Sequence, residues 1–507
     1  MNPAPSLAAS TGTSRRNLVL GFGSSAAGTL VTYAVSFAVV PFVLHRVGAE
    51  IYGAWATIAS FLAVGGLADA GIRTEIIRRV GSAQGQGDHD ELARSVRQGV
   101  TLLAALAAAI ALIGVAAAPA VRAIAFPRGV SGYGAGELDL LIRCVFGLLA
   151  GSLVANGYFG VLRGVQRGDV EATALMLSAP ASAVVTAVGV SQGWGLWALL
   201  MGGLAGLLVT VAWSSVGVRH LVPGLRLRLV ALSGPVVRGY LALSGLALLS
   251  QVSEVIDSQW DKVVLSRYVG SAAVTSFQIG TNLVLQGKAL ALLPLAPLLV
   301  AIAELRHRED ERMEALFGLM TKAGMVMASV VLGAICVFAP AFLRLWLSPG
   351  EAIEGAAVGA RLFTVAVGLN LFCAPLALRA FGEGWYAMTA VSAASNVVVN
   401  CLLSLVLTIA IGFNCALYGS IVGNLVGCAL MVVLMRRRLG LGWSPMPCRA
   451  LLIGVTCGSF GLLAGFGHVR TWPALLAAGG AYVMVVGVAC ARAEGLAIPA
   501  LLGRRMT

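Results

Sequence analysis

The sequence predicts an all-α integral membrane protein with about fourteen transmembrane helices, arranged as two parallel six-helix lobes followed by two C-terminal helices. Three observations lead to this fold class. The chain of 507 residues is 58% hydrophobic and only 11% charged, with a mean hydropathy of +0.90. Its apolar residues form runs long enough to cross a bilayer, which takes about 20 residues. Finally, the two halves of the chain share local patterns at a nearly constant separation.

The apolar runs leave no intervening stretch long enough for a soluble domain. The fourteen predicted spans cover residues 18–44, 51–72, 98–119, 138–162, 170–190, 195–217, 240–264, 272–302, 317–341, 354–378, 386–410, 414–435, 449–467 and 472–491. The first run is too long for the apolar core of a signal peptide. Residues 1–17 are therefore expected to form a short polar tail.

The basic residues predict the orientation of these spans. If the N-terminus is cytoplasmic, an even number of spans returns the C-terminus to the same side. Most of the 35 lysines and arginines then fall on the cytoplasmic side, among them Arg163, Arg167 and the run Arg436–Arg438. This bias follows the positive-inside rule and predicts a multi-pass protein of the cytoplasmic membrane with both termini in the cytoplasm. It also accounts for the net charge of +13 through contact with membrane lipids, so no nucleic-acid partner is expected.

Three local patterns recur about 220 residues apart in the chain. The pairs are His45-Arg46-Val47-Gly48 with Arg267-Tyr268-Val269-Gly270, Leu162-Arg163-Gly164 with Leu378-Arg379-Ala380, and Gly193-Trp194-Gly195 with Gly412-Phe413-Asn414. An even number of spans in each repeat makes the lobes parallel, related by an axis along the membrane normal. The predicted parts are an N-terminal tail (1–17), an N-lobe (18–218), a cytoplasmic linker (219–239), a C-lobe (240–436), two additional spans (437–492) and a cytoplasmic tail (493–507).

Several short motifs resemble those of a known transporter family. They are Gly48-Ala-Glu-Ile-Tyr52-Gly53, Asp69-Ala-Gly71, Leu162-Arg-Gly-Val-Gln166-Arg167, Asp261-Lys262-Val-Val-Leu-Ser-Arg-Tyr-Val-Gly270 and Phe342-Leu-Arg-Leu-Trp346-Leu. In order and spacing they resemble the polysaccharide transporter branch of the multidrug/oligosaccharidyl-lipid/polysaccharide exporter superfamily, which includes the O-antigen-type flippases. The resemblance covers about residues 15–440. The C-lobe departs from the pattern because it lacks the Tyr-Gly motif of the N-lobe.

The resemblance implies a transporter of two six-helix lobes around a central cavity. It implies a flippase that moves a polyprenyl-diphosphate-linked oligosaccharide to the outer leaflet by alternating access, for surface polysaccharides such as O-antigen or exopolysaccharide. A proton or a sodium ion drives transport in different members, and no other cofactor is expected. The implied partners are the lipid-linked glycan, membrane lipids and other membrane proteins of polysaccharide assembly.

Charged residues inside the predicted spans are the candidate site residues, because a charge at the bilayer centre costs about 2.5–3.5 kcal/mol on insertion scales. Arg143 and Arg361 lie at nearly equivalent positions of the two lobes, and their guanidinium groups suit a diphosphate. Either they converge on that anion, or each side chain reaches to the outer interface. Lys288 lies near the middle of its span, where it could bind phosphate or pair with Glu254 or Asp257.

The segment Gln251–Gly270 places its acidic residues on one helix face. Glu254 and Asp257 are the deepest of them and are the candidates for ion coupling, since a buried carboxyl can take up a proton or a cation. The alternative is a static pair with Lys288. Asp261 and Lys262 lie nearer the outer end and are expected to form an interfacial cap or an outer-gate ion pair.

A corresponding charged group lies at the cytoplasmic end of the second predicted span. Asp69, Arg73 and Glu75 are spaced four and two residues apart. Two interpretations fit this group: an inner-gate cluster of ion pairs, or a solvated helix end.

Other function classes find less support in the sequence. The five histidines do not cluster and the nine cysteines form no CxxC pair, so neither a metal site nor a disulfide framework is expected. An enzyme such as a polysaccharide polymerase or ligase would need reactive groups on a sizeable outer loop, and the longest, residues 120–137, contains no histidine. The remaining alternatives are an ion-coupled drug/cation antiporter of the same superfamily, with an acidic and aromatic-lined cavity, and a scaffold that has lost its cargo site.

Overall fold

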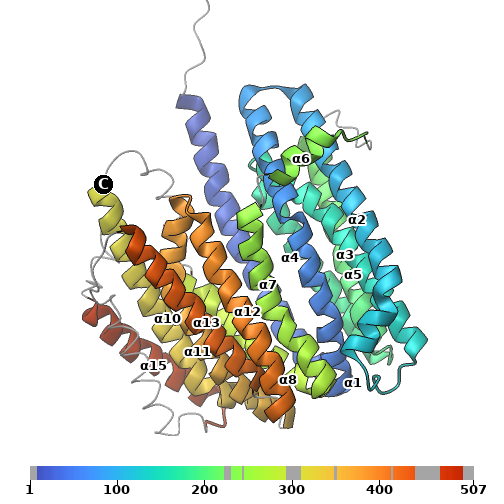
Figure 1. Cartoon of the computed structure of the whole chain (residues 1–507), viewed down its shortest axis with the longest axis vertical. Coiled ribbons are helices and arrows are strands. Elements are labelled where there is room, and N and C mark those ends of the chain that lie inside the picture. Colours follow the sequence, from blue (N-terminus) through green and yellow to red (C-terminus); the bar gives the residue numbers. More distant parts are fainter. Residues whose placement is uncertain are drawn as a thin grey trace, which may run out of the picture. The chain divides into compact units, whose positions relative to one another are not determined.

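The computed structural model describes residues 8–221, 230–242, 245–292, 310–347, 351–412, 415–439 and 469–494. Over these ranges the fold is all-α and contains no β-strand, as the sequence predicts (Figure 1). Ten helices in this part of the chain are long and apolar enough to cross a membrane. The predicted span 449–467 lies outside the described residues.

The chain divides into two compact units, Met1–Leu248 and Leu249–Thr507. The first contains α1 (Ala8–Gln86), α2 (His89–Ala125), α3 (Ala135–Gly164), α4 (Gly168–Ser191), α5 (Leu196–Leu221) and α6 (Gly234–Ala242). The second contains most of α7 (Gly245–Tyr268), together with α8 (Ser271–Leu292), α10 (Asp310–Leu347), α11 (Glu351–Gly382), α12 (Tyr386–Ile411), α13 (Cys415–Leu439) and α15 (Trp472–Ala493).

Helix α1 combines the first two predicted spans and folds back on itself at Gly48 (Figure 1). Gly28 and Arg73 are 45 residues apart, which would separate them by about 68 Å in a straight helix. Both nevertheless lie against the start of α4: a Cβ added at Gly28 would be 3.3 Å from the carbonyl oxygen of Ala172, and Arg73 Nη2 is 2.7 Å from Glu171 Oε1. Gly48 has φ 83° and ψ 167°, a conformation that essentially only glycine adopts.

The first unit is held together by two apolar cores between its helices. One core includes Ile58, Leu138 and Ile142, and packs α1 against α3. The other includes Ile76 and Tyr240, and brings the short helix α6 against α1 and α2. Helix α6 lies at the end of the unit where α1 turns into α2 and α3 turns into α4. This end, here called the arginine-rich end, carries Arg73, Arg78, Arg79, Arg163 and Arg167.

In the second unit, α12 packs on α13, and α11 packs against α8, α10 and α13. Helix α15 lies on α10, where the rings of Phe338 and Tyr482 meet edge to face with centroids 5.8 Å apart. Helix α7 lies against α12: the Trp260 indole donates a hydrogen bond to the carbonyl oxygen of Cys401 at 3.2 Å.

The backbone repeats the sequence pattern that predicted two parallel lobes. At three turns, residues with positive φ recur 218 to 222 positions apart in the two units. The pairs are Gly48 and Gly270, Gln166 and Gly384, and Gly193 and Gly412. The turns that end equivalent helices therefore share a residue with positive φ.

Candidate functional site

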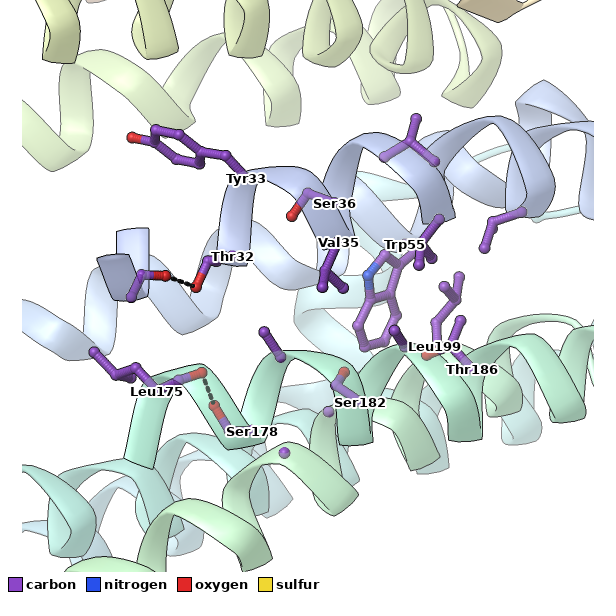
Figure 2. Close-up of a pocket in the computed structure, with 18 of the residues that line it drawn as sticks. Thr32, Tyr33, Val35, Ser36, Trp55, Leu175, Ser178, Ser182, Thr186 and Leu199 are labelled. Atoms are coloured by element: carbon purple, nitrogen blue, oxygen red, sulfur yellow. Dashed lines mark hydrogen bonds between the residues drawn. The ribbon is translucent and has the colours of Figure 1, made fainter. Parts of the chain in front are cut away.

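The first unit contains a cavity of about 750 Å³ between both halves of α1 and helices α3, α4 and α5. Figure 2 shows Val35 on α1 and Ser182 on α4 pointing toward each other across this space, with Trp55 on the second half of α1 beside Leu199 and Thr186. The fold-back at Gly48 lets one helix form two sides of the cavity.

The wall of the cavity is mainly apolar, with a few hydroxyl groups. Thr32 and Ser178 donate to backbone carbonyl oxygens of their own helices, Gly28 at 2.9 Å and Leu175 at 3.0 Å. The hydroxyls of Ser36 and Ser182 line the cavity and have no hydrogen-bond partner among the described residues. Such a surface can accept both an apolar ligand and a small number of hydroxyl or phosphate oxygens.

Among the described residues, two charged side chains line this cavity, and both belong to one ion cluster at the arginine-rich end of the unit. Arg163 donates through Nε and Nη2 to the two carboxylate oxygens of Glu171, with distances of 2.5 and 2.9 Å. Arg73 donates to the same carboxylate at 2.7 Å. The Glu171 side chain is 6% exposed, whereas that of Arg163 is 54% exposed. Two guanidinium groups around one carboxylate leave the cluster with a net positive charge.

A second ion cluster lies nearby on α1. Glu75 is buried and accepts hydrogen bonds from Arg78, at 2.6 and 2.8 Å, and from Arg79, at 2.7 Å. The Arg78 hydrogen bond is the main reason that the pKa of Glu75 is lowered. The Arg79 guanidinium lies over the ring of Tyr240, 4.3 Å from its centroid. The Tyr240 hydroxyl donates to the carbonyl oxygen of Ser95 at 3.0 Å, which fastens α6 to α2.

The predicted inner-gate residues are therefore distributed over two clusters. Arg73 pairs with Glu171 of α4, and Glu75 pairs with the two arginines that follow it. The Asp69 side chain lies outside the described residues. All of these ion pairs lie within the first unit.

The second unit holds an acidic cluster between α7, α12 and α13, in which Asp261 is buried and Asp257 is half-buried. Asp261 accepts hydrogen bonds from the hydroxyls of Ser404 and Ser420, and Asp257 accepts one from Asn400 Nδ2 at 2.8 Å. Asn400 is fully buried, and its Oδ1 has no hydrogen-bond partner among the described residues. Carboxylate, amide and hydroxyl oxygens thus meet in one buried place, and such oxygens are the ligands that hard cations prefer.

Within the described part of the chain, the side chains of Asp261 and Lys262 form no ion pair or hydrogen bond with each other. Asp261 turns to α12 and α13, whereas Lys262 Nζ donates to Gln259 Oε1 of its own helix at 2.7 Å. Adjacent residues of a helix point about 100° apart, so they seldom face the same partner. Asp261 therefore lies beside Asp257 and apart from Lys262, its expected partner in an outer-gate ion pair. The Glu254 side chain lies outside the described residues.

The three predicted phosphate contacts differ in their surroundings. Arg143 on α3 is exposed, does not line the first-unit cavity, and has no hydrogen bond or ion pair among the described residues. Lys288 is half-buried on α8. Arg361 on α11 donates from Nε to the carbonyl oxygen of Cys336 at 3.1 Å. That carbonyl lacks its helical donor because the residue four positions later is Pro340. Arg361 therefore replaces the hydrogen bond that α10 lacks at this point.

Sequence reasoning missed Glu171 and the polar face of α12. Glu171 lies in the first turn of α4, where an acidic residue usually complements the helix dipole. Its two arginine partners come from other helices and cannot be read from local spacing. By contrast, Asn396, Asn400 and Ser404 are spaced four apart in an otherwise apolar helix, and this periodicity would have identified them as one face.

The sequence matches no family model, and no curated protein sequence matches it. Solved structures do match. An inward-facing multidrug resistance MATE family transporter of the MOP superfamily is 17% identical, with a TM-score of 0.67 over 81% of this chain and 94% of that one. The lipid II flippase MurJ, in an inward closed conformation, is 10% identical, with a TM-score of 0.67 over 91% and 98%.

A MOP superfamily transporter from Pyrococcus furiosus, described as having a binding pocket of reverse polarity, is 18% identical. Its TM-score is 0.55 over 84% of this chain and 94% of that one. These likenesses extend over most of the chain and nearly all of each transporter. The chain therefore has the fold of the MOP superfamily transporters, the exporter superfamily to which its motifs point.

Proposed function

We propose that this protein is a flippase that moves a polyprenyl-diphosphate-linked oligosaccharide, or a related glycan precursor, across the cytoplasmic membrane by alternating access. Its place would be in the assembly of a surface polysaccharide such as O-antigen or exopolysaccharide, alongside other membrane proteins of that assembly. The fold of the MOP superfamily supports a transporter, and the MurJ likeness agrees with a lipid-linked cargo.

The charge of the first-unit cavity is the observation that carries this proposal. A diphosphate and sugar hydroxyls cannot cross hydrocarbon unaided, because unpaired polar groups there cost several kcal/mol each. The carboxylate that lines the cavity, Glu171, is already bound by Arg73 and Arg163. Together the three residues leave a net positive charge at this end of the cavity, which favours an anionic headgroup over a cation.

The alternative is an ion-coupled multidrug or cation antiporter. The likeness to MATE family transporters keeps it open, and such a protein would need an acidic cargo site. Asp257 and Asp261 are the acids that could serve, but Asp261 is buried against α12 and α13, where it accepts hydrogen bonds from two serine hydroxyls, and Asp257 accepts one from Asn400. We assign them, with Glu254, to the coupling proton or sodium ion.

Coupling has a physical purpose in this scheme. An inside-negative potential favours outward movement of an anion by about 2.3 kcal/mol per charge per 100 mV. A positively charged cluster that binds the anion neutralises part of its charge and so gives up part of that driving force. A cation taken up in the second unit would restore a driving force. Arg143, Arg361 and Lys288 are retained as further phosphate contacts in this proposal.

The proposal is tested by transport in vesicles that contain the purified full-length chain. A fluorescent undecaprenyl-diphosphate oligosaccharide should become accessible to a glycosidase on the opposite face, whereas the cationic dye ethidium should not be moved. The reverse result would favour the antiporter. In cells, deletion should remove the surface glycan and accumulate its lipid-linked precursor, and normal surface glycan in the deletion strain would refute the flippase.

The arginine roles can be tested in the same vesicles with the double variant Arg143→Gln, Arg361→Gln. Glutamine keeps an N–H donor for the Cys336 carbonyl but removes the positive charge. We expect transport to fall at least about tenfold, since a hydrogen bond to a charged group contributes about 1.5–3 kcal/mol. Full transport by the folded double variant would remove both residues from the substrate site.

A further inference from the structure

The Glu171 carboxylate occupies a position that an anionic ligand could also occupy. It lines the cavity and receives two parallel hydrogen bonds from the Arg163 guanidinium, through Nε and Nη2. Arginine binds phosphate oxygens with the same two-pronged geometry. The protein thus holds one of its own carboxylates where a phosphate oxygen pair would fit.

The two arginines around Glu171 are not equivalent. Arg163 lines the cavity, is 54% exposed, and has an Nη1 without a partner among the described residues. Arg73 does not line the cavity and is 23% exposed. Its guanidinium lies 5.6 Å from the centroid of the Phe159 ring, which holds it in place behind the carboxylate. One arginine can therefore move into the cavity while the other keeps Glu171 ionised and fixed.

The free energies favour an exchange, in which Arg163 leaves Glu171 for the diphosphate, over the addition of a diphosphate to the unchanged cluster. Leaving a nearly buried carboxylate without any cation is costly, so a site with a single arginine could not release it. With Arg73 remaining on Glu171, Arg163 can trade one charged acceptor for another at little net cost. A diphosphate offers more charge than a carboxylate, and the cluster's net positive charge attracts it to this end of the cavity.

We propose that Glu171 is an internal substitute for phosphate, and that Arg163 passes from Glu171 to the diphosphate of the lipid-linked cargo while Arg73 retains the carboxylate. This inference rests on the proposed flippase function and identifies Arg163 as the residue that first binds the diphosphate headgroup. Glu171 competes with the diphosphate for Arg163. When the cargo leaves, Arg163 forms its ion pair with Glu171 again, so binding stays reversible.

The chain offers a matched control four residues after Arg163. Arg167 also forms a two-pronged pair with an acid, Asp169, at 2.9 and 3.0 Å. It belongs to the same turn between α3 and α4 but does not line the cavity. Arg167→Ala removes the same charge from the same end of the unit without touching the proposed site.

The experiment is equilibrium binding of radiolabelled undecaprenyl diphosphate to the full-length protein in lipid nanodiscs. Arg163→Ala should weaken binding about 10- to 100-fold, the range expected for losing hydrogen bonds to a charged group. Arg167→Ala should stay within about twofold of the unaltered protein, as expected of a surface charge away from the site. Glu171→Gln should bind at least about threefold more tightly, because it removes the competitor for Arg163.

Unaltered lipid affinity in a folded Arg163→Ala protein would overturn this inference and leave the flippase proposal intact. If Arg163→Ala does not fold, Glu171→Gln decides: binding equal to or weaker than that of the unaltered protein would overturn the exchange. Failure of the unaltered protein to bind the lipid would overturn the exchange and the proposed function together.

Inorganic pyrophosphate distinguishes a lipid headgroup from a free anion. We expect it to displace the lipid only at concentrations at least about 100-fold higher, because it lacks the apolar chain that the membrane and cavity wall can accommodate. Displacement at equal concentration would overturn the assignment to a lipid headgroup.

Discussion

The first half of α1 and helix α7 hold equivalent places in the two repeats, yet they present opposite chemistry. An offset of 222 residues relates the turns that follow them. With this offset, Asp257 and Asp261 of α7 correspond to Val35 and Val39 of α1, and both valines line the first-unit cavity. One repeat thus has an apolar cavity wall where the other has two acids that hydrogen-bond to neighbouring helices.

The ionic contacts of the two units differ in the same way. In the first unit, the buried carboxylates Glu75 and Glu171 are each bound by two arginines at one end of the bundle. In the second, Asp261 lies within the helix bundle and is bound by serine hydroxyls. Under the proposed function, the first unit would bind the anionic cargo and the second would bind the coupling cation.

The largest effect is expected where the second unit would lose its acids. A tenfold ion gradient supplies about 1.4 kcal/mol per ion. Asp257→Asn with Asp261→Asn should abolish the response of vesicle transport to a proton or sodium gradient, lowering the gradient-driven accumulation ratio about tenfold for one coupled ion. The amides keep hydrogen-bonding atoms for the surrounding hydroxyls, so the helices should remain packed.

The control for the double variant is Glu383→Gln, which removes an acid at the end of α11 in the same unit and away from the cluster. Its response should match that of the unaltered protein. A gradient response that survives in the Asp257, Asp261 double variant would make the acidic cluster structural, and the comparison between the units would then lose its functional meaning.

An intermediate effect is expected at the turn on which the first-unit cavity depends. Gly48→Ala places a Cβ on a residue with φ 83° and ψ 167°, and such backbone strain costs about 1–3 kcal/mol. The melting temperature of the purified protein should fall accordingly. Gly85→Ala is the matched control, because Gly85 is helical on the same element and has open space around it. It should be neutral or stabilising, and an equal loss in both variants would contradict the fold-back at Gly48.

Particular residues show what could be predicted from the sequence. The fold class and the two parallel lobes follow from apolar runs and from recurring turns such as Gly48 and Gly270, which are local features. The ion cluster at Glu171 joins residues up to 98 positions apart, so only the packing of α1, α3 and α4 brings it together. The adjacency of Asp261 and Lys262 in the chain predicts a common role, whereas helix geometry directs adjacent side chains apart.

The smallest effect is expected on stability at acidic pH, from the Glu75 cluster, which lies outside the predicted spans. The Arg78 hydrogen bond lowers the folded-state pKa of Glu75 below its ordinary value of 4.5. Its contribution to stability is therefore present at neutral pH and is lost as the pH falls through the lowered folded pKa. Because Arg78 is 56% exposed, that contribution should not exceed about 1 kcal/mol.

The measurement is the melting temperature between pH 7 and pH 3 for the unaltered protein and for Glu75→Gln. The variant should melt slightly lower at neutral pH, and the two curves should converge in acid once Glu75 is protonated. Arg94→Gln, which removes an exposed i,i+3 pair with Glu91 on α2, is the control and should leave the difference between neutral and acid pH nearly unchanged. Parallel curves for the unaltered protein and Glu75→Gln would show that the arginines do not stabilise this carboxylate, and the contrast with the hydroxyl-bound acids of the second unit would then rest on Glu171 alone.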